Sequence, residues 1–219
     1  MSKRFALWGG LVVGLAAVTL VMFRMADDES AAPETTAAGA GNSVNEEILE
    51  PRQDDWIKGN PDAGVIVVKY SDFQCPACRF YASMDDRLSE ELGDDVLFVY
   101  RHFPLRNFEH SRLASRYAEA AGRQDAFWEM HDLIYINQQQ WSRGDAESIF
   151  RQFADSIELD MDQLDEDLQD PELSDRIEAD YEDGQELGVR SVPSLFINGE
   201  AVENPRSLDD YRDLIISYQ

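Results

Sequence analysis

Residues 65–78, which read VIVVKYSDFQCPAC, decide the fold of this protein. The run 65–70 is rich in β-branched residues and predicts a buried β-strand. A helix is expected to begin at Cys75, because apolar residues then recur at steps of three and four. Pro76 suits the first turn of a helix, where its missing N–H costs nothing. Cys75 and Cys78 therefore lie where a strand gives way to a helix.

The cysteine pair predicts thiol–disulfide exchange. Cys75 is expected at the helix N-terminus, where unpaired N–H groups and the helix dipole favour a thiolate, so we assign it as the nucleophile. Cys78 follows after Pro76 and Ala77 and is assigned as the resolving thiol. Half of a zinc site and a purely structural disulfide are the alternatives for this motif. We expect no metal, because the chain has only two cysteines and its three histidines lack the spacing of a zinc motif.

The rest of the chain has the pattern of an α/β domain with a helical insertion. Residues from about 108–187 show helical periodicity, whereas the segments on either side of this block show strand patterns. Asn198 and Gly199 form a strong hairpin-turn signal, and Ser207 with Asp210 predicts the capped start of a last helix. The other expected strands are residues 96–100, 194–197 and 201–203.

The N-terminal residues have the pattern of a membrane segment. Residues 5–23 carry no charge, follow two basic residues and are long enough, as a helix, to cross a bilayer. The positive-inside rule places the N-terminus in the cytoplasm and the rest of the chain outside. We expect a membrane anchor over residues 1–24, with a cleaved signal peptide as the alternative. Residues 25–50 predict a flexible linker, and residues 51–219 the globular domain.

The composition is strongly acidic, with a formal net charge of −25. Such a surface argues against nucleic acid as a partner, because phosphate binding requires a basic face. Only three of the 19 basic residues are lysines. Many acids with few lysines are typical of halophilic proteins, since high salt screens the self-repulsion. We therefore expect a saline habitat, with an ordinary acidic secreted protein as the alternative.

Several segments together resemble the DsbA-like thioredoxin-fold family. The segments that carry the resemblance are residues 59–63, 67–78, 101–105, 127–131 and 191–199. They occur in the family's order and span roughly residues 55–219. The resemblance implies a thioredoxin fold with an inserted helical subdomain. It also implies that Val192–Pro193 is a cis peptide bond that faces the cysteines, and that the backbone beside it pairs with an extended substrate segment.

One residue departs from the family pattern. Thioredoxin-like proteins commonly carry a buried acid six residues before the first cysteine, where it assists proton transfer to the resolving thiol, and this chain has Lys69 there. A charged lysine lowers the pKa of nearby thiols, so Lys69 is a candidate tuning residue. Alternatively, it points away or pairs with one of the many acids. His102 and His131 are interpreted as packing residues.

The sequence therefore predicts an extracytoplasmic thiol–disulfide oxidoreductase that introduces disulfide bonds into exported proteins. Its redox-active Cys75–Cys78 disulfide needs no metal or organic cofactor. The resemblance implies recharging by a membrane redox partner of the DsbB or VKOR type, and we expect a monomer. The alternatives are a membrane-tethered disulfide reductase or isomerase, and a non-catalytic, chaperone-like binding module.

Overall fold

The structure, a computed structural model, describes residues 47–219. The expected membrane anchor and most of the expected linker lie outside the described residues. The helices are α3 (Pro76–Glu91), α4 (Ser111–Gly122), α5 (Phe127–Ile136), α6 (Gln138–Trp141), α7 (Ala146–Ser156), α8 (Met161–Asp167), α9 (Pro171–Glu186) and α10 (Leu208–Ile216). The strands are β1 (Trp56–Gly59), β2 (Val65–Ser71), β3 (Val96–His102), β4 (Ser194–Ile197) and β5 (Glu200–Val202). Among residues 47–219, no helix combines the length and hydrophobicity that a membrane crossing requires.

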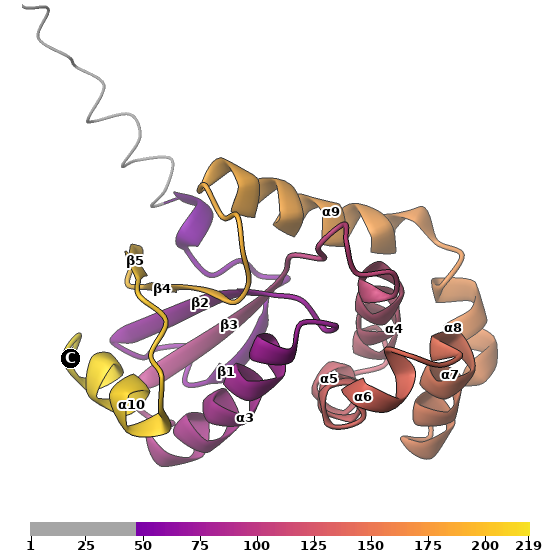
Figure 1. The fold of residues 1–219 in the computed structure, drawn as a ribbon, viewed down its shortest axis with the longest axis horizontal. Coiled ribbons are helices and arrows are strands. Elements are labelled where there is room, and N and C mark those ends of the chain that lie inside the picture. The colour runs from indigo at the N-terminus through magenta and orange to yellow at the C-terminus, as the bar shows by residue number, and fades with distance from the viewer. Residues whose placement is uncertain (1–46) are drawn as a thin grey trace, which may run out of the picture. The chain divides into compact units, whose positions relative to one another are not determined.

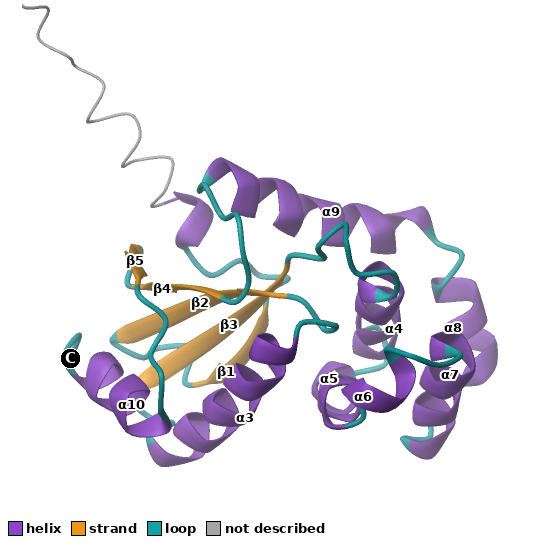
Figure 2. Ribbon diagram, viewed as in Figure 1, coloured by secondary structure: helices purple, strands orange, loops and turns teal. Residues whose placement is uncertain are grey.

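The strands form one sheet in the order β1-β3-β2-β4-β5 (Figure 2). β2 and β3 are parallel and are connected through α3, whereas the other neighbouring pairs are antiparallel. Strands β2 to β5 confirm the expected ones, with small differences at their ends. β1 is an addition, because its four residues, WIKG, show neither a β-branched run nor an alternating pattern. The arrangement is that of a thioredoxin fold.

Helices cover both faces of the sheet (Figure 1). On one face, α3 and α10 pack against the strands. The side chains of this first core include Val65, Val67, Tyr81, Leu88, Phe98, Ile197 and Tyr211. On the other face, α9 packs against a second core. Its side chains include Val68, Tyr70, Val99, Tyr181 and Phe196. Alternate residues of β2 thus enter different cores, as the two-residue period of a strand requires.

The helical insertion packs around its own core and against the loop that precedes the cysteines. Predicted at about 108–187, it runs from Ser111 in α4 to Glu186 in α9. Phe73 of the loop packs against Tyr100 of β3 and Tyr135 of α5, with ring centroids 5.5 and 4.9 Å apart. The insertion therefore holds the chain immediately before the cysteine pair.

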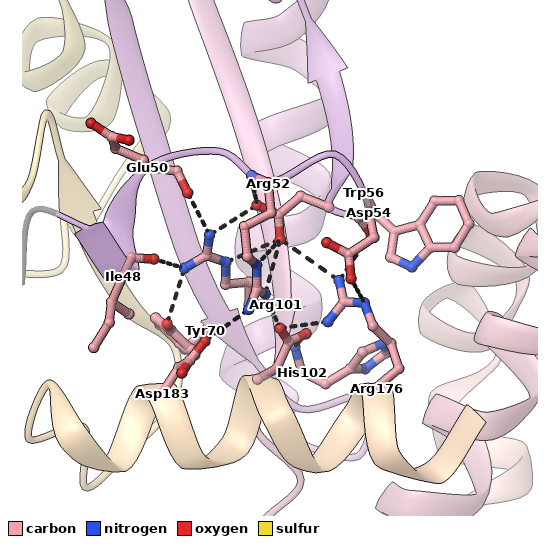
Figure 3. Close-up of polar contacts among 12 residues, drawn as sticks. Ile48, Glu50, Arg52, Asp54, Trp56, Tyr70, Arg101, His102, Arg176 and Asp183 are labelled. Carbon is pink, nitrogen blue, oxygen red and sulfur yellow. Dashed lines mark hydrogen bonds and ion pairs between the residues drawn. The ribbon is translucent and has the colours of Figure 1, made fainter. Parts of the chain in front are cut away.

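A buried arginine ties the first described residues to the sheet (Figure 3). Arg101 of β3 has no exposed surface and donates hydrogen bonds to the backbone carbonyls of Ile48 and Glu50. Leu49, between them, is buried in the second core. Residues just before Pro51, near which the sequence pattern placed the start of the domain, therefore contact the folded sheet. The segment is too short to show a periodic signal of its own.

Buried aspartates extend this contact into an ionic network (Figure 3). Asp55 pairs with Arg101 at 2.9 Å and with Arg52 at 3.1 Å. Asp180 of α9 pairs with Arg52 and, at 2.6 Å, with Arg176. The side chains of both aspartates are fully buried. The network thus joins the N-terminal segment, β3 and α9.

We predict that Asp55→Ala lowers the free energy of unfolding by about 3–5 kcal/mol, because it leaves the buried Arg101 guanidinium without its carboxylate partner. Glu178→Ala is the matched control, since it removes an exposed partner of Arg112 and should cost less than about 1 kcal/mol. Urea denaturation measures both variants. Equal losses in the two would contradict a structural role for the buried network.

Candidate functional site

Cys75 occupies the N-terminal boundary of α3. Its backbone is extended, and Pro76 follows it in the first turn of the helix. The Cys75 N–H donates to the carbonyl of Asp72 at 3.1 Å, and the Cys75 carbonyl accepts from the N–H of Arg79 at 3.2 Å. Cys75 is 7% exposed, Cys78 has no exposed surface, and both are free thiols. Cys75 therefore keeps a small exposed area, whereas Cys78 is fully buried.

A loop from near the other end of the chain faces Cys75. The Val192–Pro193 peptide bond is cis, which confirms the expectation from the resemblance. The Cys75 Sγ lies 3.5 Å from the carbonyl oxygen of Val192, to which it donates only when it is protonated. Pro76 and Ala77 are exposed beside the thiol. The structure thus brings the predicted cysteines, the residues between them and the cis-proline loop together.

The surroundings of the two thiols move their pKa values apart. A hydrogen bond with the Cys78 thiol is the main cause that lowers the pKa of Cys75 to about 6, and the N–H groups of Cys78 and Ala77 contribute while burial opposes. Burial, reinforced by the adjacent Cys75, raises the pKa of Cys78 well above its usual range. At neutral pH Cys75 is therefore a thiolate and Cys78 a thiol. A nucleophile with a resolving partner requires this division.

Asp72 supports the site, although no spacing or motif in the sequence identified it. Its buried carboxylate accepts from the Ser111 hydroxyl at 2.6 Å and from the N–H groups of Leu105 and Gln74, each at 2.7 Å. Burial raises the pKa of Asp72, and these hydrogen bonds oppose the rise. Its own N–H lies 3.5 Å from the Cys78 sulfur. Asp72 therefore fixes the turn that presents the cysteines.

Gln138 holds the same turn from the helical insertion. Its side-chain amide, at the start of α6, donates to the carbonyls of Phe73 at 2.7 Å and Cys75 at 2.9 Å. The residue is only 3% exposed. Because Gln138 is distant in sequence from the cysteines, no local pattern could have connected them.

Lys69 lies buried on β2, where its ammonium pairs with the carboxylate of Asp85 on α3. The pair borders a cavity of about 10 Å³, which has room for about one water and is also lined by Tyr100 and His131. Burial raises the pKa of Asp85, and Lys69 opposes the rise. Pairing with an acid, one of the alternatives from the sequence, is confirmed. Tuning of the thiols by Lys69 stays a prediction.

The two histidines belong to the packing between the sheet and the insertion. Burial lowers the pKa of His131 to about 4, so the ring is neutral at pH 7, and its Nδ1 lies 2.7 Å from the Asp132 carboxylate. His102 Nε2 lies 2.7 Å from Glu119, which also accepts from the Trp56 indole at 2.6 Å.

In the described part of the chain, no group of three or more His, Cys, Asp or Glu side chains is arranged to hold a metal.

The fold and the paired cysteines at a helix N-terminus define a thioredoxin-fold dithiol protein. A profile of the family described as thioredoxin matches residues 52–216, and the chain belongs to this family. A thioredoxin-like oxidoreductase from Silicibacter pomeroyi DSS-3 superposes with a TM-score of 0.68 at 26% identity, over 78% of this chain and 95% of that one. Wolbachia pipientis alpha-DsbA1 gives a TM-score of 0.70 at 19% identity, over 80% and 95%.

The chain also matches one part of longer proteins, the Na(+)/H(+) antiporters. The chain is 34% identical over 163 residues to Na(+)/H(+) antiporter NhaA 1 of Mycolicibacterium gilvum, which is 72% of this chain and 25% of that protein. It is 31% identical over 210 residues to Na(+)/H(+) antiporter NhaA 3 of Salinispora tropica, which is 94% of this chain and 31% of that protein. The chain thus matches only a quarter to a third of the length of these relatives.

We predict that Cys75 titrates with a pKa of about 6, measured from the ultraviolet absorbance of its thiolate as the pH is raised. Because this pKa lies below the ordinary value of 9.0, the thiolate stabilises the reduced fold fully above about pH 9. That stabilisation is lost as the pH falls through about 6. Cys78→Ala should raise the pKa of Cys75, since it removes the main hydrogen bond. A Cys75 pKa near about 8.5 in the unsubstituted protein would contradict the assignment.

We predict that Lys69→Met raises the pKa of Cys75, because removing a buried positive charge disfavours a thiolate. It should also lower the free energy of unfolding by about 3 kcal/mol, since Asp85 loses its buried partner. Lys58→Met is the matched control, because it removes the more exposed Lys58–Asp86 pair. An unchanged thiol pKa in folded Lys69→Met protein would exclude Lys69 as a tuning residue.

Proposed function

We propose that this protein is an extracytoplasmic thiol–disulfide oxidoreductase that introduces disulfide bonds into exported proteins. One observation carries the proposal: the partly accessible Cys75 sulfur stands at the N-terminus of α3, 3.5 Å from the carbonyl of Val192 in the cis-proline loop. Cys75 and Cys78 are the catalytic residues, and Pro76, Ala77, Val192 and Pro193 surround the reacting sulfur.

The reaction is a two-step exchange that starts from the oxidised pair. A substrate thiolate attacks the Cys75 sulfur, forms a mixed disulfide and displaces Cys78 as a thiolate. A second substrate thiolate then attacks the substrate sulfur of this mixed disulfide and displaces Cys75. The substrate gains one disulfide, and its two electrons remain on the reduced Cys75–Cys78 pair.

The charge on Cys75 favours this direction of electron flow. A thiolate that is stable at neutral pH stabilises the reduced form, and a pair whose reduced form is stabilised is a strong oxidant. Cys75 is also the better leaving group of the two thiols, because thiols of lower pKa leave faster. Both effects favour the step in which Cys75 leaves the mixed disulfide and the oxidised substrate is released.

The cis-proline loop is proposed as the surface that holds the substrate. Val192 is partly exposed and lies two residues before Ser194, the first residue of β4. An extended substrate segment can pair with this backbone as an added strand, which positions a substrate cysteine without reading its side chains. Such pairing suits an enzyme that acts on many unfolded exported proteins.

The surroundings of the enzyme complete the proposal. Residues 5–23 would anchor the monomeric protein with the catalytic domain outside the cytoplasm, in a saline habitat that its charge of −25 suits. A membrane protein of the DsbB or VKOR type would take the electrons and restore the Cys75–Cys78 disulfide without a metal or organic cofactor in this chain. Transport belongs to the whole antiporters, of which this chain matches only 25–31%.

We predict that the oxidised full-length protein forms disulfides in a reduced, unfolded substrate with two cysteines, measured by loss of free thiols. Cys75→Ser should abolish this activity, because it removes the attacked sulfur. Cys78→Ser should block re-oxidation and trap mixed disulfides with substrates in cells, since no resolving thiol remains. Reduction of substrate disulfides in place of their formation would establish the reductase alternative. Full function of Cys75→Ser in cells would establish the binding module.

A further inference from the structure

The buried Cys78 lies at one end of a short chain of hydroxyl groups. Ser71 is the last residue of β2 and is 1% exposed, and its Oγ lies 3.0 Å from the hydroxyl oxygen of Tyr135 on α5. Hydrogen bonding by the Ser71 side chain lowers the pKa of Cys78 against the larger effect of burial, and the N–H of the next residue, Asp72, lies 3.5 Å from the Cys78 sulfur. Tyr135 is 3% exposed, and the ring of Phe73 packs against it. The Ser71–Tyr135 hydroxyl pair therefore lies in a region closed to bulk water.

A negative charge on Cys78 selects the direction of these hydrogen bonds. Either oxygen can donate in the Ser71–Tyr135 contact. When Cys78 is a thiolate, Ser71 must donate to the sulfur, so Tyr135 donates to Ser71. Burial raises the pKa of Tyr135 well above its usual range, which keeps its hydroxyl protonated and available as a donor. The Asp72 N–H, 3.5 Å from the Cys78 sulfur, is a further donor to this sulfur.

We propose that Ser71 and Tyr135 stabilise the Cys78 thiolate as the Cys75–Cys78 disulfide opens, a role that rests on the proposed exchange function. When an incoming thiolate bonds to the Cys75 sulfur, the Cys75–Cys78 bond breaks and its electron pair remains on the Cys78 sulfur. No proton moves in this step. The charge is held by the Ser71 O–H, which the Tyr135 O–H polarises, and by the Asp72 N–H.

The need for such donors follows from the burial of the leaving group. Burial raises the pKa of Cys78 well above its usual range, so without donors it would be a poor leaving group. Fixed hydrogen-bond donors in a water-excluded site stabilise developing charge more than they would in water. Lys69, at the position where related proteins carry an acid, is instead paired with Asp85. Ser71 is thus a catalytic residue and Tyr135 a positioning residue.

The test is the rate at which reduced glutathione opens the disulfide of the oxidised full-length protein, followed by stopped-flow fluorescence. Ser71→Ala should slow the reaction about tenfold and Tyr135→Phe about threefold, the loss expected for one buried hydrogen bond and for part of one. The double variant should match Ser71→Ala, because Tyr135 acts through Ser71. Ser71→Thr keeps the hydroxyl and should retain most of the rate. Matched controls are Ser115→Ala and Tyr117→Phe, two buried hydroxyl residues of α4, which should stay within about twofold.

A second readout separates charge stabilisation from packing. In a Cys75→Ala background, Ser71→Ala should raise the pKa of Cys78 further, which a loss of packing alone would not do. A Ser71→Ala rate within twofold of the unsubstituted protein, or independent losses that multiply in the double variant, would overturn the inference. An unsubstituted protein that forms no disulfide would instead overturn the proposed function and the inference with it. If Ser71→Ala fails to fold, the comparison of Tyr135→Phe with Tyr117→Phe decides.

Discussion

The rest of the site depends on one constraint, the fixed position of the Cys75 sulfur between the first turn of α3 and the carbonyl of Val192. The helix N-terminus supplies N–H groups that favour a thiolate, and the cis-proline loop faces the sulfur from the other side. Residues 117 positions apart meet here because β2 and β4 are adjacent strands. The sheet order therefore converts a local Cys-x-x-Cys motif into a site that can hold a substrate.

The helical insertion is part of this site as well as its cover. Gln138 fixes the loop carbonyls before the cysteines, Ser111 binds the Asp72 carboxylate, and Tyr135 reaches Ser71 beside the buried thiol. The ionic network around Arg101 joins the N-terminal segment and α9, the last helix of the insertion, to the sheet (Figure 3). Removing one partner from such a network is strongly destabilising, because it leaves a buried charge uncompensated.

Sequence reasoning succeeded where the signal was local. The strand and helix on either side of residue 72, the insertion and the last helix followed from periodicity, and the expected cap at Ser207 accepts from the Asp210 N–H at 3.0 Å. It missed β1, because the four residues of this strand have no strand pattern of their own. Pairing with β3 holds them in the sheet. Gln138 and the identity of the acid that pairs with Lys69, Asp85, were also beyond it, because both arise from contacts between residues that are not neighbours in sequence.

The most direct test of this account is the reduction potential of the Cys75–Cys78 pair, measured by equilibrating the full-length protein with reduced and oxidised glutathione at high salt. The stable Cys75 thiolate stabilises the reduced pair, so the account predicts a potential well above about −270 mV, in the direction of a strong oxidant near about −120 mV. Such a value would support the introduction of disulfides into exported proteins. A potential near about −270 mV, that of a thioredoxin-like reductant, would contradict the account.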